Sequence, residues 1–144
     1  MAWLLVCLFG VPLVFAKGNY DDLKPVPVVV MLGNAKNEMK FFPDHLKFET
    51  GKVYKLLLVN DSPITHEFVS SALSDAVFTL KAEVISPDGV EIAEIVGTIH
   101  EIEVAPQTTV EWYFVPLHTA TNASFICDQP GHLLAGMKGQ FTIE

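Results

Sequence analysis

The feature that most constrains the fold of this chain is a succession of short β-branched and aromatic segments separated by turn residues. No long stretch has the 3.6-residue periodicity of an amphipathic helix. Gly, Pro, Asn and Asp mark the turns, as in Asn60-Asp61-Ser62-Pro63. This spacing predicts an all-β domain, a two-sheet β-sandwich with Greek-key connections. The expected strands cover residues 26–32, 46–48, 53–60, 66–70, 78–85, 99–104, 109–114, 124–127 and 139–143, with a short helical turn over 71–77.

Size and charge limit the classes of function that this chain can have. A chain of 144 residues is the size of one ordinary domain. Half of the residues are hydrophobic and 18% are charged, which excludes disorder for most of the chain. The formal net charge is −8, opposite in sign to the surface that binds nucleic acid or an anionic membrane. A positively charged protein is the partner that this charge favours.

The first sixteen residues form an uncharged apolar run from Ala2 to Ala16. The run has the length of a signal-peptide core and is too short to span a bilayer comfortably. We therefore expect a signal peptide at 1–16, a flexible leader at 17–25 and a folded domain at 26–144. The protein is then periplasmic or otherwise exported, without stable membrane insertion after cleavage. No Lys or Arg precedes the run, which leaves an uncleaved anchor or a misassigned start as the alternatives.

Cysteine usage points to a bound metal. The chain has two cysteines, and removal of a signal peptide takes Cys7 away. Cys127 then has no partner for an internal disulfide. A lone thiol in an oxidising compartment is a liability unless something occupies it, and a metal ion would do so.

Three potential metal ligands share one loop between two expected strands. Cys127, His132 and Met137 supply a thiolate, an imidazole and a thioether, and Pro and Gly residues between them allow the loop to fold back. The loop holds one imidazole, so a further ligand must come from elsewhere. His66 begins an expected strand just after a turn and is the candidate. Two imidazoles, a thiolate and a weak axial Met are the donor set of a blue-copper electron-transfer site.

These residues resemble the cupredoxin family over nearly all of the mature chain. An edge His follows an Asn-containing turn, from Asn60 to His66, and Cys, His and Met precede the last strand. The Cys-x4-His-x4-Met spacing is most similar to the rusticyanin and auracyanin type. The resemblance implies a cupredoxin-like domain at 26–144 that holds one copper ion, Cu(I) or Cu(II), through His66, Cys127, His132 and axial Met137. It also implies a monomeric electron carrier whose partner is a redox protein, such as a cytochrome or a membrane oxidase.

The sequence departs from the family pattern at Glu67, where well-known members have an Asn or Ser that ties the two ligand loops together. A carboxylate beside the metal favours its more positive, oxidised state. We therefore expect a lower reduction potential than an Asn would give. The segment over 72–98 is also longer than in plastocyanin, and no role is predicted for it.

The partner is expected to dock near His132. Pro130, Gly131, Leu133, Leu134 and Ala135 would form a small apolar ring around the imidazole edge. The alternative is that the two leucines pack inward.

Other functions have less support in the sequence. There is no His-Glu-x-x-His motif, no Gly-rich phosphate loop, no Cys-x-x-Cys pair and no nucleophile elbow. A nucleophile and base made of Cys127 and His132 would lack an orienting group, so an enzyme is not expected. Zinc could use the same donors, but the thioether favours copper. Copper delivery or resistance through the same site is the alternative function, although no Met- or His-rich segment supports it.

The remaining histidines and one possible glycosylation motif are not predicted to have a functional role. His45, His100 and His118 are expected to be surface or turn residues. Asn122-Ala123-Ser124 matches a glycosylation acceptor, and we interpret this short motif as a chance match.

Overall fold

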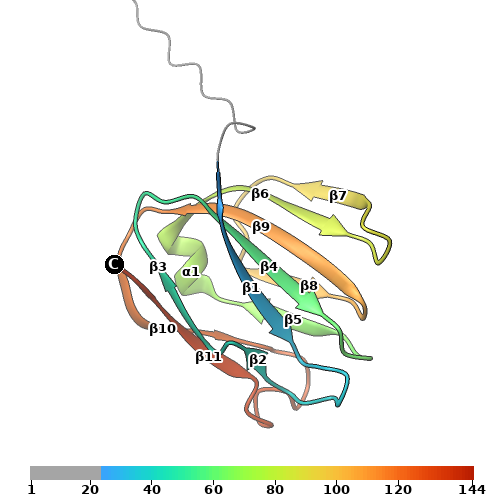
Figure 1. The fold of residues 1–144 in the computed structure, drawn as a ribbon. Helices are drawn as coiled ribbons and strands as arrows, with labels where there is room; N and C mark the ends of the chain where they lie inside the picture. The colour runs from blue at the N-terminus through green and yellow to red at the C-terminus, as the bar shows by residue number, and fades with distance from the viewer. Residues whose placement is uncertain (1–23) are drawn as a thin grey trace, which may run out of the picture.

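The protein, described here by a computed structural model, forms two β-sheets over residues 24–144 (Figure 1). The expected two-sheet β-sandwich is confirmed. The signal peptide and most of the leader were expected on residues that lie outside this described part. In spatial order, the larger sheet contains β2 (Phe41–Phe42), β1 (Val26–Leu32), β4 (Tyr54–Asn60), β9 (Thr108–Pro116), β6 (Val77–Ile85) and β7 (Glu91–Ile95). The second contains β3 (His45–Phe48), β11 (Lys138–Ile143), β10 (Ala120–Ile126), β5 (His66–Val69) and β8 (Glu101–Val104).

Both sheets are mixed. β1 pairs in parallel with β4, β3 pairs in parallel with β11, and the remaining pairs are antiparallel. Along β4, buried residues alternate with half-buried ones from Tyr54 to Asn60. This period of two is what a central strand needs when one of its faces lies on the core.

Aromatic side chains fill the space between the sheets. Phe125 of β10 stacks on Phe68 of β5 at 4.8 Å between ring centroids and meets Phe41 edge to face at 5.0 Å. All three rings are fully buried, and burial of each stabilises the fold by about 1.5–3 kcal/mol. Since Phe68 and Phe125 lie on the strands that carry His66 and lead to Cys127, this packing fixes the two strands relative to each other.

The observed elements agree closely with those expected from the sequence. β1 has the expected bounds, and the helical turn over 71–77 is the helix α1 (Ser71–Ala76), where Ser70 Oγ accepts from Leu73 N at 3.2 Å. β10 begins four residues earlier than expected, at Ala120, because a bulge with Asn122 at φ 51° lets the polar start of the strand keep pairing. β2 and β7 were not expected.

No helix within residues 24–144 combines the length and the apolar character that crossing a membrane requires.

Candidate metal centre

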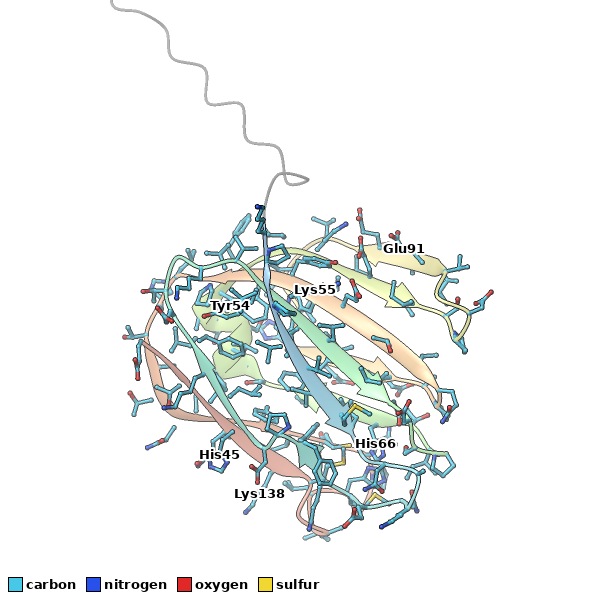
Figure 2. All side chains as sticks on the ribbon, in the orientation of Figure 1. His45, Tyr54, Lys55, His66, Glu91 and Lys138 are labelled. Carbon is cyan, nitrogen blue, oxygen red and sulfur yellow. The ribbon has the colours of Figure 1, made fainter. Side chains whose placement is uncertain are left out.

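The four expected ligands come from one end of the sandwich. His66 is the first residue of β5, Cys127 directly follows β10, and His132 and Met137 lie in the loop that leads to β11. Figure 1 shows this loop beside β2, at the end where β1 terminates. Figure 2 places His66 at the same end of the molecule, away from His45 and Glu91.

The turn before His66 is built around Asn60, which is fully buried. Its Nδ2 donates to the carbonyls of Ile64 and Val104, each at 2.8 Å. Its Oδ1 accepts from the backbone N of Ser62 at 3.0 Å and from Ser62 Oγ at 2.7 Å. One amide side chain therefore ties the turn to itself and to β8, so that His66 enters β5 in a fixed orientation.

The loop over 127–137 is closed by its own backbone. Cys127 N donates to Met137 O at 3.1 Å, Met137 N donates to His132 O at 3.0 Å, and His132 N donates to Gln129 O at 3.0 Å. Gly131 and Gly136 have φ angles of 86° and 98°, in the left-handed region that favours glycine. The two glycines let three ligand-type residues share one short loop.

Three donor atoms converge. His132 Nδ1 lies 3.2 Å from both His66 Nδ1 and Cys127 Sγ, and Cys127 Sγ lies 3.9 Å from His66 Nδ1. The point equidistant from these atoms is about 2.0 Å from each, close to the bonds of roughly 2.0–2.3 Å that imidazole and thiolate make to a first-row metal. The residues therefore fit a metal ion bound in a trigonal plane.

The remaining candidates lie as follows. Met137 is fully buried, and its peptide is bonded to the Cys127 and His132 peptides, so the thioether belongs to the same compact loop. The other three histidines, expected at the surface or in turns, are exposed: His45, His100 and His118.

Burial sets the electrostatics of the donors. It lowers the pKa of His66 to about 4, with a contribution from the neighbouring His132. Burial likewise raises the pKa of the Cys127 thiol. The imidazole is thus neutral and ready to bind a metal, whereas the thiol needs a nearby cation to become a thiolate. Glu67 N points at Cys127 Sγ at 3.3 Å and provides a hydrogen bond for a thiolate.

Glu67 also links the two ligand segments. Gln129 Nε2 donates to Glu67 Oε1 at 2.8 Å, and the Glu67 side chain is buried. Desolvation, reinforced by Glu101 and Glu103, raises the pKa of the Glu67 carboxyl. The residue that departs from the family pattern therefore still joins the strand of His66 to the loop of Cys127.

Two residues at the site were missed from the sequence. Gln129 has no sequence signal, because its side-chain contact with Glu67 cannot be read from spacing. Gly33 packs against the imidazole of His66, and its sequence signal was the Gly-Asn pair that directly follows β1.

Comparison with known proteins agrees with this geometry. No curated protein sequence matches the chain. Among solved structures, auracyanin B is similar over 85% of this chain and 92% of its own, with 20% identity and a TM-score of 0.55. Auracyanin A from Chloroflexus aurantiacus has 16% identity and a TM-score of 0.50, covering 84% of this chain and 100% of its own.

A larger enzyme contains a similar domain. The multicopper oxidase McoA from Aquifex aeolicus matches 90% of this chain but 31% of its own length, with 17% identity and a TM-score of 0.60. At these identities the structures show a shared fold. Residues 28–144 match the family described as copper binding proteins, plastocyanin/azurin family. The expected resemblance is thereby confirmed, and the chain belongs to the plastocyanin/azurin family of copper-binding proteins.

Proposed function

We propose that this protein is an exported type 1 (blue) copper protein that acts as a small electron carrier. His66, Cys127 and His132, together with Met137, would hold one copper ion. The observation that carries the proposal is the convergence of one thiolate-forming sulfur and two imidazole nitrogens, separated by 3.2, 3.2 and 3.9 Å, at the end of the sandwich.

The chain holds these donors in a fixed arrangement. His66, Cys127 and Met137 are fully buried, and their strands are braced by packed aromatic rings. Copper in this site would supply a one-electron couple between Cu(II) and Cu(I). Because the scaffold positions the donors before and after the electron moves, little rearrangement accompanies transfer. Burial also slows metal exchange, which favours a carrier over a protein that delivers copper.

Electrons would enter and leave at His132, the one half-buried ligand. Leu134 beside it is 94% exposed and Leu133 is 41% exposed, so these leucines do not pack inward. Together with the exposed Pro130, Gly131 and Ala135, they support the expected apolar ring. Such a small apolar surface suits brief contact with a redox protein.

The charge near this ring favours a basic partner. Glu101, Glu103 and Asp128 are exposed, and Gln129 links this region to the buried Glu67. The chain as a whole carries −8. A redox protein with a positively charged docking face, such as a cytochrome or a membrane oxidase, would be steered to this end of the molecule.

Export and the lack of a catalytic role are part of the proposal. Export rests on the uncharged run over residues 2–16. The carrier role is supported by the similarity to auracyanin A, a blue copper protein, over 84% of this chain and the whole of auracyanin A. The multicopper oxidase, in contrast, is about three times the length of the region that it shares with this chain.

Spectroscopy of the chain from Lys17 onward, with Cu(II) added, tests the proposal. We expect an intense blue or green band and narrow copper hyperfine splitting in electron paramagnetic resonance. Cys127→Ser should remove the band while far-ultraviolet circular dichroism stays unchanged. A protein that binds no copper would overturn the proposal. A colourless protein that holds Cu(I) alone, or fast copper loss to a chelator with slow electron self-exchange, would instead support copper handling.

A further inference from the structure

The His66 ring lacks the usual hydrogen bond behind a metal ligand. Its Nε2 is buried and has no hydrogen-bond partner among the residues of the described part. In most metal sites the second ring nitrogen donates to a carboxylate, a carbonyl or water, and that bond sets the orientation of the ring. Something else must therefore hold the His66 imidazole with Nδ1 toward Cys127 and His132.

The main chain at Gly33 is packed against this nitrogen. A Cβ atom built on Gly33 would lie 2.6 Å from His66 Nε2 and 3.2 Å from Ser62 Cβ. The first distance is shorter than side chains tolerate, so the absence of a side chain allows the approach. Gly33 also has a φ of 69°, in the left-handed region where other residues are strained.

The loop that begins at Gly33 is held by its own hydrogen bonds and forms a wall behind the ring. Gly33 N donates to Lys40 O at 2.9 Å, which closes the loop between β1 and β2. Asn34 Oδ1 accepts from the backbone N of Lys36 at 2.9 Å and of Glu38 at 3.2 Å. These bonds hold the loop internally and give the backbone at Gly33 a defined position behind the imidazole.

We propose that Gly33 is a positioning residue for the copper ligand His66. Its bare backbone is a steric stop behind Nε2 that replaces the missing hydrogen bond and keeps Nδ1 directed at the other two donors. The inference rests on the proposed function in that His66 must be a ligand for the stop to affect copper. The wall itself is a property of the folded chain with or without metal.

Gly33→Ala, compared with Gly51→Ala, tests the proposal. Gly51 also has a left-handed φ, 76°, but nothing lies within 4 Å of its Cβ position, and it precedes β4 at the end away from His66, on the order of 20 Å from it by strand length. Both variants carry the same kind of backbone strain. We expect Gly33→Ala to shift the thiolate-to-copper absorption and to weaken Cu(II) binding by about 10- to 100-fold, as loss of an orienting partner does. Gly51→Ala should leave the spectrum unchanged. An unchanged spectrum and affinity in Gly33→Ala would overturn the proposal.

A second variant and a measurement on the apoprotein keep the proposal testable if Gly33→Ala does not fold. Gly33→Asn keeps the close Cβ contact but tolerates a left-handed backbone, so it should fold better than Gly33→Ala and shift the spectrum in the same way. In the wild-type apoprotein, nuclear Overhauser contacts should join the Gly33 α-protons to His66 Hε1 or Hδ2, and their absence would contradict the wall. A wild-type protein that shows these contacts but never turns blue would refute the proposed function and leave the wall in place.

Discussion

The ligand-bearing end of the sandwich and the β6–β7 hairpin hold their polar groups in different ways. At the ligand end, Asn60 is fully buried and its side chain makes four hydrogen bonds, and Glu67 is bonded to Gln129. In the hairpin, all five residues of β7 are exposed, and Lys81 bridges the carboxylates of Glu83 and Glu94 at the sheet edge. Figure 2 shows Glu91 of β7 well away from His66.

The difference indicates which parts of this fold tolerate amino-acid substitutions. Buried polar groups with several partners have one low-energy arrangement, which a metal site with preset geometry requires. An edge strand with exposed side chains makes few such demands and belongs to the part of a fold that opens most easily. Substitutions at the two ends should therefore differ in both size and kind.

Asn60→Ala should produce the largest effect on stability. It removes the Asn60 partner of the Val104 carbonyl and of the Ser62 N–H in a buried turn, whereas the Ile64 carbonyl and the Ser62 hydroxyl keep their hydrogen bond to each other at 2.9 Å. Each unsatisfied buried group costs about 1–3 kcal/mol, so we expect the free energy of unfolding of the apoprotein to fall by about 3 kcal/mol or more in urea titration. Ser62→Ala, which removes one partner, is the control and should cost less. A loss below about 1 kcal/mol for Asn60→Ala would show that the turn is not held by this side chain.

The ligand end should also give the apoprotein a pH-dependent stability. The pKa of His66 is lowered to about 4 in the folded state, below the ordinary value of 6.5. The unfolded chain therefore takes up the proton first, and the stability that neutral His66 contributes is complete above pH 6.5 and is lost as the pH falls toward 4.

Urea unfolding of the apoprotein across this window measures the effect. The wild type should lose stability faster than His66→Phe, in which the titrating group is gone, while His118→Gln, at an exposed site, should follow the wild type. Identical slopes for the wild type and His66→Phe would contradict a buried, neutral His66.

At the surface of the ligand end, Leu134→Lys should slow electron exchange with a basic redox partner. Leu134 is 94% exposed, so its replacement does not disturb the core. The charge breaks the apolar ring around His132 and repels the partner, and we expect the exchange rate to fall by about tenfold, equal to about 1.4 kcal/mol. Stopped-flow kinetics measure the rate, and the copper spectrum should stay the same. An unchanged rate would mean that the electron leaves elsewhere.

Glu67→Gln should raise the reduction potential. Glu67 is buried and its backbone N lies 3.3 Å from Cys127 Sγ, while its carboxylate acts on Cys127 through its charge. This negative charge favours Cu(II), whereas Gln keeps the shape and removes the charge. We expect a rise of some tens of millivolts, since roughly 59 mV is a tenfold change for a one-electron couple. Protein-film voltammetry measures it, and Glu103→Gln, at an exposed carboxylate, should shift the potential less. No change, or a drop, would refute the expected influence of Glu67.

Most of the fold and the donor set could be predicted from the sequence because their signals are local. Alternating buried residues mark β4, and the order of Cys127, His132 and Met137 on a Pro- and Gly-containing loop marks the site. His66 could be selected because a turn and a strand start coincide there.

The contacts that complete the site depend on residues far apart in sequence. The bond from Gln129 to Glu67 joins residues 62 positions apart, and Gly33 meets His66 although β2, β3 and β4 lie between them in the sequence. β7 was missed for the opposite reason: with every side chain exposed, Glu91–Ile95 has no buried face and hence no period of two. The contacts of Gln129 and Gly33 form only when the chain folds, and β7 is a strand only because it pairs with β6.

The smallest effect is expected in the hairpin. Ile92 is 63% exposed on β7, and Ile92→Thr keeps a β-branched side chain on the strand. We expect the free energy of unfolding to change by less than about 0.5 kcal/mol and the copper spectrum to be unaffected. Urea titration of Ile92→Thr and Asn60→Ala under the same conditions compares the two regions by their free energies of unfolding. A loss of about 2 kcal/mol or more would contradict the contrast, because such a loss requires a burial that the exposed edge strand does not provide.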